Sequence, residues 1–321
     1  MKHRRLFALL GLFACLLGLV ACGDDGDDGT SGTAAKKGAI TRNPENADTT
    51  IRVGSKNFTE QIVLGEIYAQ GLEAAGYRVE RELNLGNENV AQQALADRKI
   101  DGYPEYIGTA LLSICDVPAE AAPKDPAIAF KDVRECFASR GVTALEPTPF
   151  TSSNEVAVSA DTADRYGLIR ISDLKKVDQD FTLYGSQECR ERSDCLAGLQ
   201  DVYGLKFKTF AEIPVSERHE ALKRGAQLAS IVFTTDPQNR RDGIVLLEDD
   251  LGMFPPNTSS FLVRNDVAEQ AGPDLPRVIA RLQRGLTDEV MQELNARVDL
   301  DKQTPAQVAT DYLDQARLVV K

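Results

Sequence analysis

This sequence has very little histidine. It also lacks the common motifs of catalytic nucleophiles and of phosphate-binding loops. It holds two histidines, His3 and His219, and His219 lies in the charged stretch 216–220. No Gly-x-Ser-x-Gly sequence, phosphate-binding glycine loop or Cys-x-x-Cys pair occurs. Because catalysis by a nucleophile needs a poised base, these absences argue against an enzyme, a cofactor or a metal site. The acidic run 248–250 is interpreted as a strand end rather than a calcium or hydrolytic site.

Positive charge is also scarce. Lysine and arginine number 37 against 49 acidic residues, which gives a net charge of −12. Removing an N-terminal segment with Lys2, Arg4 and Arg5 would bring the charge to about −15. Such a chain is a poor partner for nucleic acid or for anionic lipid.

The N-terminus has the pattern of an export signal. A basic start and the apolar run 6–20 lead to Leu-Val-Ala-Cys at 19–22, and the run is too short for a good membrane span. The cysteine predicts a bacterial lipoprotein signal over residues 1–22, with Cys22 as the lipidated N-terminus. An ordinary secretory signal is the alternative. Residues 23–49 begin with small and acidic residues and are expected to be a flexible acidic linker.

The remaining cysteines are Cys115, Cys136, Cys189 and Cys195. An even number in an oxidising compartment predicts two disulfides. Three pairings are open, and closure of short loops favours Cys115 with Cys136 and Cys189 with Cys195. A metal site is the competing interpretation, and the near absence of histidine weakens it.

Strand and helix patterns alternate along the chain. Strands are expected at 51–54, 77–85 and 100–103, with one helix between Thr59 and Gly76 and another from Asn87. Thr59 is placed to cap the first helix and Gly76 to end it. This β-α-β-α-β order predicts a parallel sheet. The two strand-to-helix turns, 55–60 and 101–109, concentrate polar and aromatic side chains where α/β sheets bind ligands.

A second α/β unit follows, with strands expected at 156–158, 181–184, 207–213, 228–233 and 244–247. Prolines at about 147–150 and 254–257 mark two crossings between the units. We therefore predict an α/β, two-lobed protein with a two-strand hinge and a ligand cleft between the lobes. Lobe 1 comprises 50–148 and 257–321, and lobe 2 comprises 149–256.

Five motifs in one order and spacing carry a resemblance to a known family. They are VGSKNFTEQ at 53–61, NLG at 84–86, YPEY at 103–106 with Gly-Thr at 108–109, ISDL at 171–174 and LEDD at 247–250. Together they resemble the substrate-binding proteins of osmoprotectant ABC importers, which bind glycine betaine, choline, proline betaine and related compounds. The resemblance implies a type II periplasmic-binding-protein fold.

The resemblance also implies a site in which aromatic faces hold a quaternary ammonium and basic groups hold a carboxylate. Lys56, Tyr106 and Thr109 match motif positions, and Lys56 has the alternative role of supporting its loop. Glu188 and Arg192 lie in the loop that supplies a carboxylate-binding arginine in relatives, although Arg192 could instead pair with Glu188.

At three of the expected contact positions, the residue type differs from the one that is common in the family. Where many relatives carry cage tyrosines, this chain has Asn154, Phe233 and Asn257. Phe233 keeps an aromatic face, and the two amides could bind a more polar ligand by hydrogen bonds.

The function expected is that of an exported binding protein that closes on glycine betaine or a related quaternary-ammonium osmoprotectant. It would be a monomer, lipid-anchored at the outer face of the cell membrane or on its periplasmic side, and would deliver solute to an ABC permease and ATPase. Another zwitterion, such as ergothioneine or a more polar amine, is the alternative ligand. A ligand-sensing module for a membrane receptor is the rival role.

Overall fold

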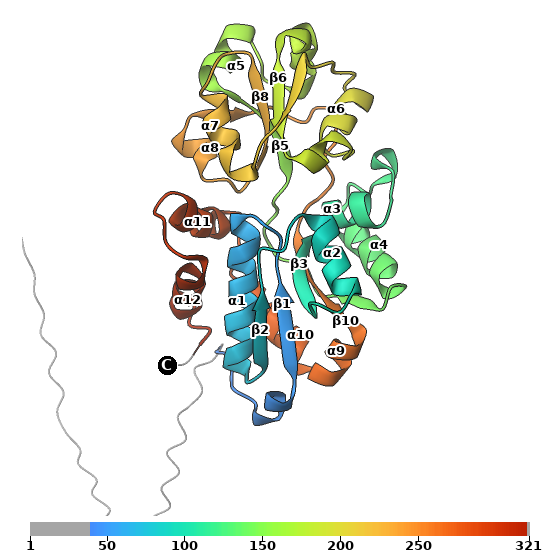
Figure 1. Ribbon diagram of the computed structural model, residues 1–321, viewed down its shortest axis with the longest axis vertical. Helices are drawn as coiled ribbons and strands as arrows, with labels where there is room; N and C mark the ends of the chain where they lie inside the picture. The colour runs from blue at the N-terminus through green and yellow to red at the C-terminus, as the bar shows by residue number, and fades with distance from the viewer. Residues whose placement is uncertain (1–38, 320–321) are drawn as a thin grey trace, which may run out of the picture. The chain divides into compact units, whose positions relative to one another are not determined.

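The computed structural model describes residues 39–319, and within them the strands form two five-stranded sheets. The first sheet has the order β2-β1-β3-β10-β4 (Figure 1). Its strands are β1 (Thr50–Gly54), β2 (Arg78–Glu82), β3 (Gly102–Tyr106), β4 (Val142–Ala144) and β10 (Ser259–Arg264). Strands β2, β1 and β3 are parallel, as the sequence predicts, while β10 is antiparallel to both of its neighbours.

Helices from both ends of the chain pack with this sheet (Figure 1). They are α1 (Thr59–Ala75), α2 (Glu88–Ala96), α3 (Ile107–Thr109), α4 (Pro126–Ala138), α9 (Asn265–Ala271), α10 (Asp274–Gln283), α11 (Asp288–Asp299) and α12 (Pro305–Gln315). Leu64, Ile67 and Leu72 of α1 are fully buried in the core. Gly76 ends this helix in the left-handed conformation, with φ 106°. The expected cap is wrong, because Thr59 is the first helical residue and donates its hydroxyl hydrogen to Asp299 at 2.6 Å.

The second sheet has the order β7-β6-β8-β5-β9. Its strands are β5 (Asn154–Ser159), β6 (Thr182–Gly185), β7 (Thr209–Glu212), β8 (Leu228–Phe233) and β9 (Ile244–Leu246), and its helices are α5 (Ala160–Tyr166), α6 (Leu196–Asp201), α7 (Arg218–Leu222) and α8 (Gln238–Arg241). We call the first sheet with its helices the first lobe and the second sheet with its helices the second lobe. The α/β, two-lobed architecture is confirmed.

Two segments, 145–153 and 247–258, connect the sheets (Figure 1). They run antiparallel where Thr151 pairs with Thr258, and the Ser152 N–H donates to the carbonyl of Asn257 at 3.1 Å. Paired crossings of this kind give a hinge two chain segments wide. Sheet membership agrees with lobes divided near these segments, and the boundaries at 148/149 and 256/257 stay a prediction.

The N-terminal part of the first lobe corrects the predicted linker. Ile40 is buried in the core, its N–H donates to the carbonyl of Leu318 at 2.7 Å, and Pro44–Asp48 form a short 3-10 helix capped by Asn43. Residues 39–49 are therefore packed, because this stretch contains apolar and capping residues that the acidic run before it lacks. The signal at 1–22, the lipidated Cys22 and residues 23–38 of the linker lie outside the described residues.

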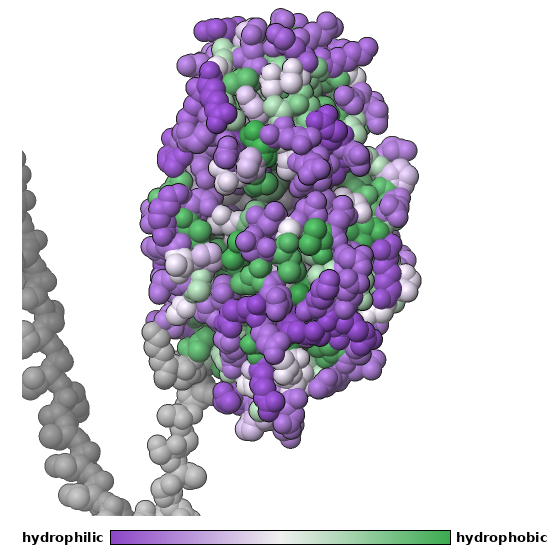
Figure 2. Space-filling model, in the orientation of Figure 1, coloured by the Kyte–Doolittle hydropathy of each residue, from purple (hydrophilic) through white to green (hydrophobic). Residues whose placement is uncertain are grey.

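Both favoured disulfides are confirmed. Cys115 bonds to Cys136 in the first lobe, and Cys189 bonds to Cys195 in the second. No helix within residues 39–319 is long and apolar enough to cross a membrane. Figure 2 shows a face that is mostly hydrophilic, with hydrophobic side chains gathered around a hollow near its middle.

Candidate functional site

A cavity of about 70 Å³ lies between the two lobes. Tyr106 reaches it from the last residue of β3, Asn154 from the first residue of β5 and Phe233 from the last residue of β8. The structure brings all the predicted ligand contacts together here: Lys56, Tyr106, Thr109, Asn154, Glu188, Arg192, Phe233 and Asn257 line this one cavity. Their roles in binding stay a prediction.

Tyr106 is held by a buried carboxyl group. Its hydroxyl donates to Glu60 at 2.6 Å, and Asn295 of α11 donates to the same carboxyl at 2.8 Å. Burial raises the pKa of Tyr106 well above its usual value, and the charge of Glu60 adds to this. Burial also raises the pKa of Glu60, while hydrogen bonds with Thr235 and Tyr106 oppose the rise. Tyr106 therefore presents a fixed ring to the cavity.

Lys56 forms a buried ion pair with Glu105. Its ammonium nitrogen also lies 4.7 Å from the centre of the Tyr106 ring. The lysine is only 3% exposed, so the charge that it brings is already matched by a carboxylate. This geometry supports the interpretation that Lys56 braces the loop.

Asn257 joins the hinge to the first lobe. Its side-chain oxygen accepts from the Thr109 N–H at 3.2 Å, and its amide nitrogen donates to the carbonyl of Ser152 at 2.6 Å. Both ends of the amide thus have backbone partners. Asn257 thereby joins the walls of the cavity, and one N–H and one oxygen lone pair of its amide take no part in these two bonds.

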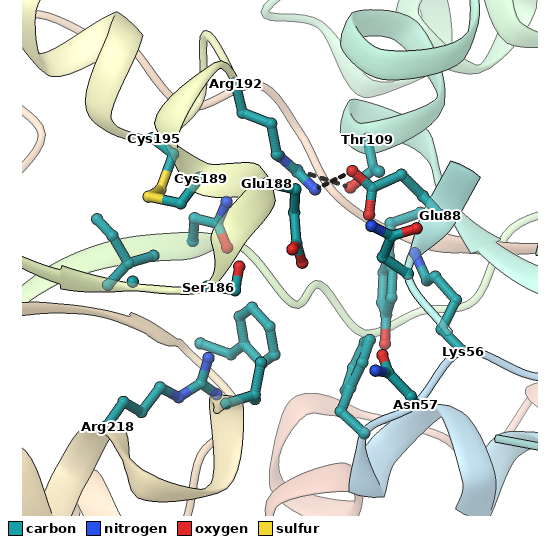
Figure 3. Close-up of a pocket in the computed structure, with 18 of the residues that line it drawn as sticks. Lys56, Asn57, Glu88, Thr109, Ser186, Glu188, Cys189, Arg192, Cys195 and Arg218 are labelled. Carbon is teal, nitrogen blue, oxygen red and sulfur yellow. Dashed lines mark hydrogen bonds and ion pairs between the residues drawn. A yellow bond between two sulfur atoms is a disulfide. The ribbon is translucent and has the colours of Figure 1, made fainter. Parts of the chain in front are cut away.

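Arg192 spans the cavity from the second lobe (Figure 3). It donates to Asp194 through Nε at 2.7 Å and to Glu88 through Nη1 at 2.9 Å, and its Nη2 lies 3.4 Å from the Thr109 hydroxyl. Burial lowers the pKa of Arg192, but the charges of Asp194 and Glu88 outweigh this and raise it above the usual value. The expected pairing with Glu188 is absent, because Glu88 and Asp194 take its place.

Two further predicted contacts, Asn154 and Glu188, differ in whether their side chains have hydrogen-bond partners within the protein. Asn154 donates to the backbone oxygen and a carboxylate oxygen of Asp194, both at 3.2 Å. Glu188 is half-buried, and its carboxylate has no hydrogen bond or ion pair with any residue in the described part of the chain. Figure 3 shows this side chain directed into the cavity beside the Cys189–Cys195 disulfide, whose closed loop begins at the next residue.

Comparison with known proteins decides the family. Residues 49–315 match the family model for the substrate binding domain of ABC-type glycine betaine transport systems. The chain belongs to this family. It is 31% identical, over 84% of its length and 89% of the relative's, to a glycine-betaine-binding protein of Pseudomonas aeruginosa.

Other proteins similar to this chain differ in the solute for which they are named. An ergothioneine transport permease/binding protein of Helicobacter pylori is 27% identical over 86% of this chain, and the chain spans about half (49%) of that relative. The solved structure of apo YehZ from Escherichia coli matches with a TM-score of 0.62 and 27% identity, covering 84% of this chain and 99% of that one. The chain is therefore the substrate-binding component of a betaine-type ABC transport system.

The cavity is also lined by an aromatic residue, Phe58, that was not among the predicted ligand contacts. Phe58 stacks on Tyr106 with ring centres 6.2 Å apart and packs against Phe233 at 5.1 Å. Its position inside the first motif was an available signal. Together Phe58, Tyr106 and Phe233 place three aromatic rings at the cavity.

Arg218 was also missed, and the sequence gives little signal for it. It begins α7 in a charged stretch that reads as a solvated surface, yet it is 5% exposed and lines the cavity. Its guanidinium carbon lies 3.8 Å from the centre of the Phe233 ring. Among the residues that the structure describes, no cluster of three metal-ligating side chains occurs.

Proposed function

We propose that this protein captures glycine betaine or a close quaternary-ammonium analogue between its lobes and delivers it to an ABC permease and ATPase. The observation that carries the proposal is an interlobe cavity with three aromatic rings and the unpartnered carboxylate of Glu188. A trimethylammonium group donates no hydrogen bonds, so it is held by aromatic faces and by a nearby negative charge. The similarity to the glycine-betaine-binding protein of Pseudomonas aeruginosa supports the same class of solute.

Closure of the lobes is the proposed mechanism. Tyr106 and Thr109 contact the solute from the first lobe, and Asn154, Glu188 and Phe233 contact it from the second. A solute that touches both walls binds the closed form more tightly than the open form, and it shifts the hinge equilibrium by that difference in affinity. The closed form is then the one that docks on the permease.

A thermal-shift panel tests the choice of solute. Glycine betaine, proline betaine, choline, carnitine, ergothioneine and amino acids are each added to the purified protein. We expect the largest rise in melting temperature with a betaine, because only ligands that bind the folded state stabilise it. A rise with amino acids alone, and with no quaternary ammonium, would refute the proposal.

A larger zwitterion is the second candidate, and one observation favours it. A second cavity, of about 470 Å³, adjoins the first at Phe58, Arg218 and Phe233. This space suits a solute with a ring, as in the ergothioneine-binding relative. In the same panel, a shift with ergothioneine that exceeds every betaine would favour this candidate.

We further propose that Cys22 anchors the protein by lipid to the outer face of the cell membrane or on its periplasmic side, as a monomer. The family's role in import and the Leu-Val-Ala-Cys sequence at 19–22 support this. Cys22→Ser is expected to release the protein from the membrane fraction and to abolish labelling with a fatty-acid analogue. Retention of either property in this variant would exclude the anchor.

A further inference from the structure

Two arginines line the interlobe cavity, and they differ in how many donors remain free. All three guanidinium nitrogens of Arg192 have partners, and two of those partners, Glu88 and Asp194, are buried carboxylates. One positive charge therefore faces two negative ones. A solute carboxylate that approached Arg192 would meet net negative charge and would have to displace Glu88 or Asp194.

Arg218 is in the opposite situation. Its Nη2 donates to Asp236, while Nε is buried without a partner. Its Nη1 makes no hydrogen bond with any residue of the described chain. A buried guanidinium with unused N–H groups loses hydration that nothing replaces. A carboxylate supplies the missing acceptors, in the planar geometry that a guanidinium prefers.

The surroundings of Arg218 favour an anion at this point. The guanidinium lies over Phe233, which occupies one of its faces and leaves the N–H groups directed along its own plane. Arg218 lines both the small cavity and the adjoining larger one. Burial lowers the pKa of Arg218, and the nearby charge of Asp236 opposes this.

The second-lobe side of the cavity therefore holds an unpaired carboxylate and an arginine whose ion pair with Asp236 uses only one of its three nitrogens. Glu188 supplies a carboxylate without a partner, and Arg218 supplies unused donors; both belong to the second lobe (Figure 3). We propose that Arg218, and not Arg192, binds the carboxylate of a zwitterionic solute, whose ammonium group faces Glu188 and the aromatic rings. This inference rests on the proposed function for the ammonium end, and it assigns the anionic end separately.

Three probes separate the two ends of the solute. Glycine betaine carries both charges, choline carries the same trimethylammonium without the carboxylate, and acetate carries the carboxylate alone. Calorimetric titration of the full-length protein with betaine and choline is compared for wild type, Arg218→Gln and the matched control Arg192→Gln. Arg218→Gln should weaken betaine binding by at least about tenfold and change choline binding by less than about threefold.

The control discriminates the two arginines. Arg192→Gln removes a bridge between the lobes, so we expect it to change betaine and choline affinity by a similar factor and to preserve their ratio. A selective loss of betaine in Arg192→Gln, or an equal loss of both ligands in Arg218→Gln, would overturn the assignment.

A second measurement holds even when a variant does not fold. In wild-type protein labelled with ¹⁵N-arginine, the Nε–H resonance of Arg218 should move on addition of acetate or betaine and stay in place with choline. If the protein binds neither betaine nor choline, the proposed function fails, and the acetate titration still decides this inference. A shift confined to Arg192, or no arginine shift with acetate, would disprove the role of Arg218.

Discussion

The two walls of the interlobe cavity differ in how completely their polar groups are paired. On the first-lobe wall, Lys56 is neutralised by Glu105, and Tyr106 donates to Glu60. On the second-lobe wall, Glu188 has no partner among the described residues, and Arg218 has one of its three nitrogens paired. Lys56 and Tyr106 of the first wall are thus paired without a ligand, whereas the second wall leaves the carboxylate of Glu188 and two nitrogens of Arg218 without partners.

This difference suggests separate roles for the two walls in binding a solute. The paired groups of the first wall keep the Tyr106 ring in place and reduce the entropy lost on binding. Unpaired charges gain the most when a ligand arrives, so they discriminate between solutes. We infer that the first lobe supplies a fixed platform and the second lobe supplies selectivity, and the predictions below test this contrast.

The largest effect is expected from breaking the platform. Lys56→Met leaves Glu105, which is 1% exposed, as an unpaired buried charge, and should cost about 3–5 kcal/mol of unfolding free energy. Urea denaturation measures the loss. The double variant Lys56→Met/Glu105→Gln should recover most of it, and a single-variant cost below about 1 kcal/mol would show that this wall is not a paired platform.

The disulfides should separate stability from binding. Replacing Cys115 and Cys136 with serine opens a separation of 21 residues and should cost about 3 kcal/mol, against about 2 kcal/mol for Cys189 and Cys195, which are 6 residues apart. Only the second pair lies directly beside Glu188 in the sequence and at the cavity, so betaine affinity should fall in that variant alone. Denaturation and calorimetry of both variants check this, and an equal loss of affinity would contradict it.

A half-buried acid of the second lobe, Glu155, should give a pH dependence. Burial raises the pKa of Glu155 to about 7, and the charge of Asp249 adds to the effect. The unfolded chain loses this proton near its ordinary pKa of 4.5, so between the two values the folded state binds more protons. Stability should therefore fall as pH rises through that window, by at most about 3 kcal/mol, and level off above it.

Glu155→Gln removes that titration. Urea midpoints at pH 5 and pH 8 should lie closer together in the variant than in wild type, and the variant should be relatively more stable at pH 8. The exposed change Asp161→Asn serves as the control. If the wild type and Glu155→Gln lose stability equally between these pH values, the carboxyl of Glu155 does not behave as described.

The smallest effect concerns the free carboxylate itself. Glu188→Gln should weaken choline binding by about 0.5–1 kcal/mol, because the group is half-buried and its charge is partly screened by water. Glu191→Gln, on the same loop but outside the cavity, is the matched control and should leave the affinity unchanged. Equal effects of the two substitutions would mean that the contribution is long-range and that Glu188 does not face the solute.

The sequence predicts much of this arrangement. Hydrophobic periodicity and proline positions indicated two α/β units with two crossings, and short loops favoured the disulfides that the structure contains. Motif positions brought Lys56, Tyr106 and Thr109 to one cavity. These features depend on neighbouring residues or on the order and spacing of motifs, so they can be predicted from the sequence. The packing of residues 39–49 was missed because its few buried residues, among them Ile40 and Asn46, follow no periodic pattern along the chain.

Only the tertiary structure decided which polar groups are free. Arg192 is occupied because Glu88, 104 residues away in the other lobe, meets it across the cavity. Arg218 is buried because β8 places Phe233 against its guanidinium. Pairings of this kind depend on how two lobes pack, and no spacing rule along the chain encodes them. The sequence by itself therefore determined the family, the two-lobed fold and a set of residues that line one cavity, whereas packing between the lobes determined which polar groups there lack partners.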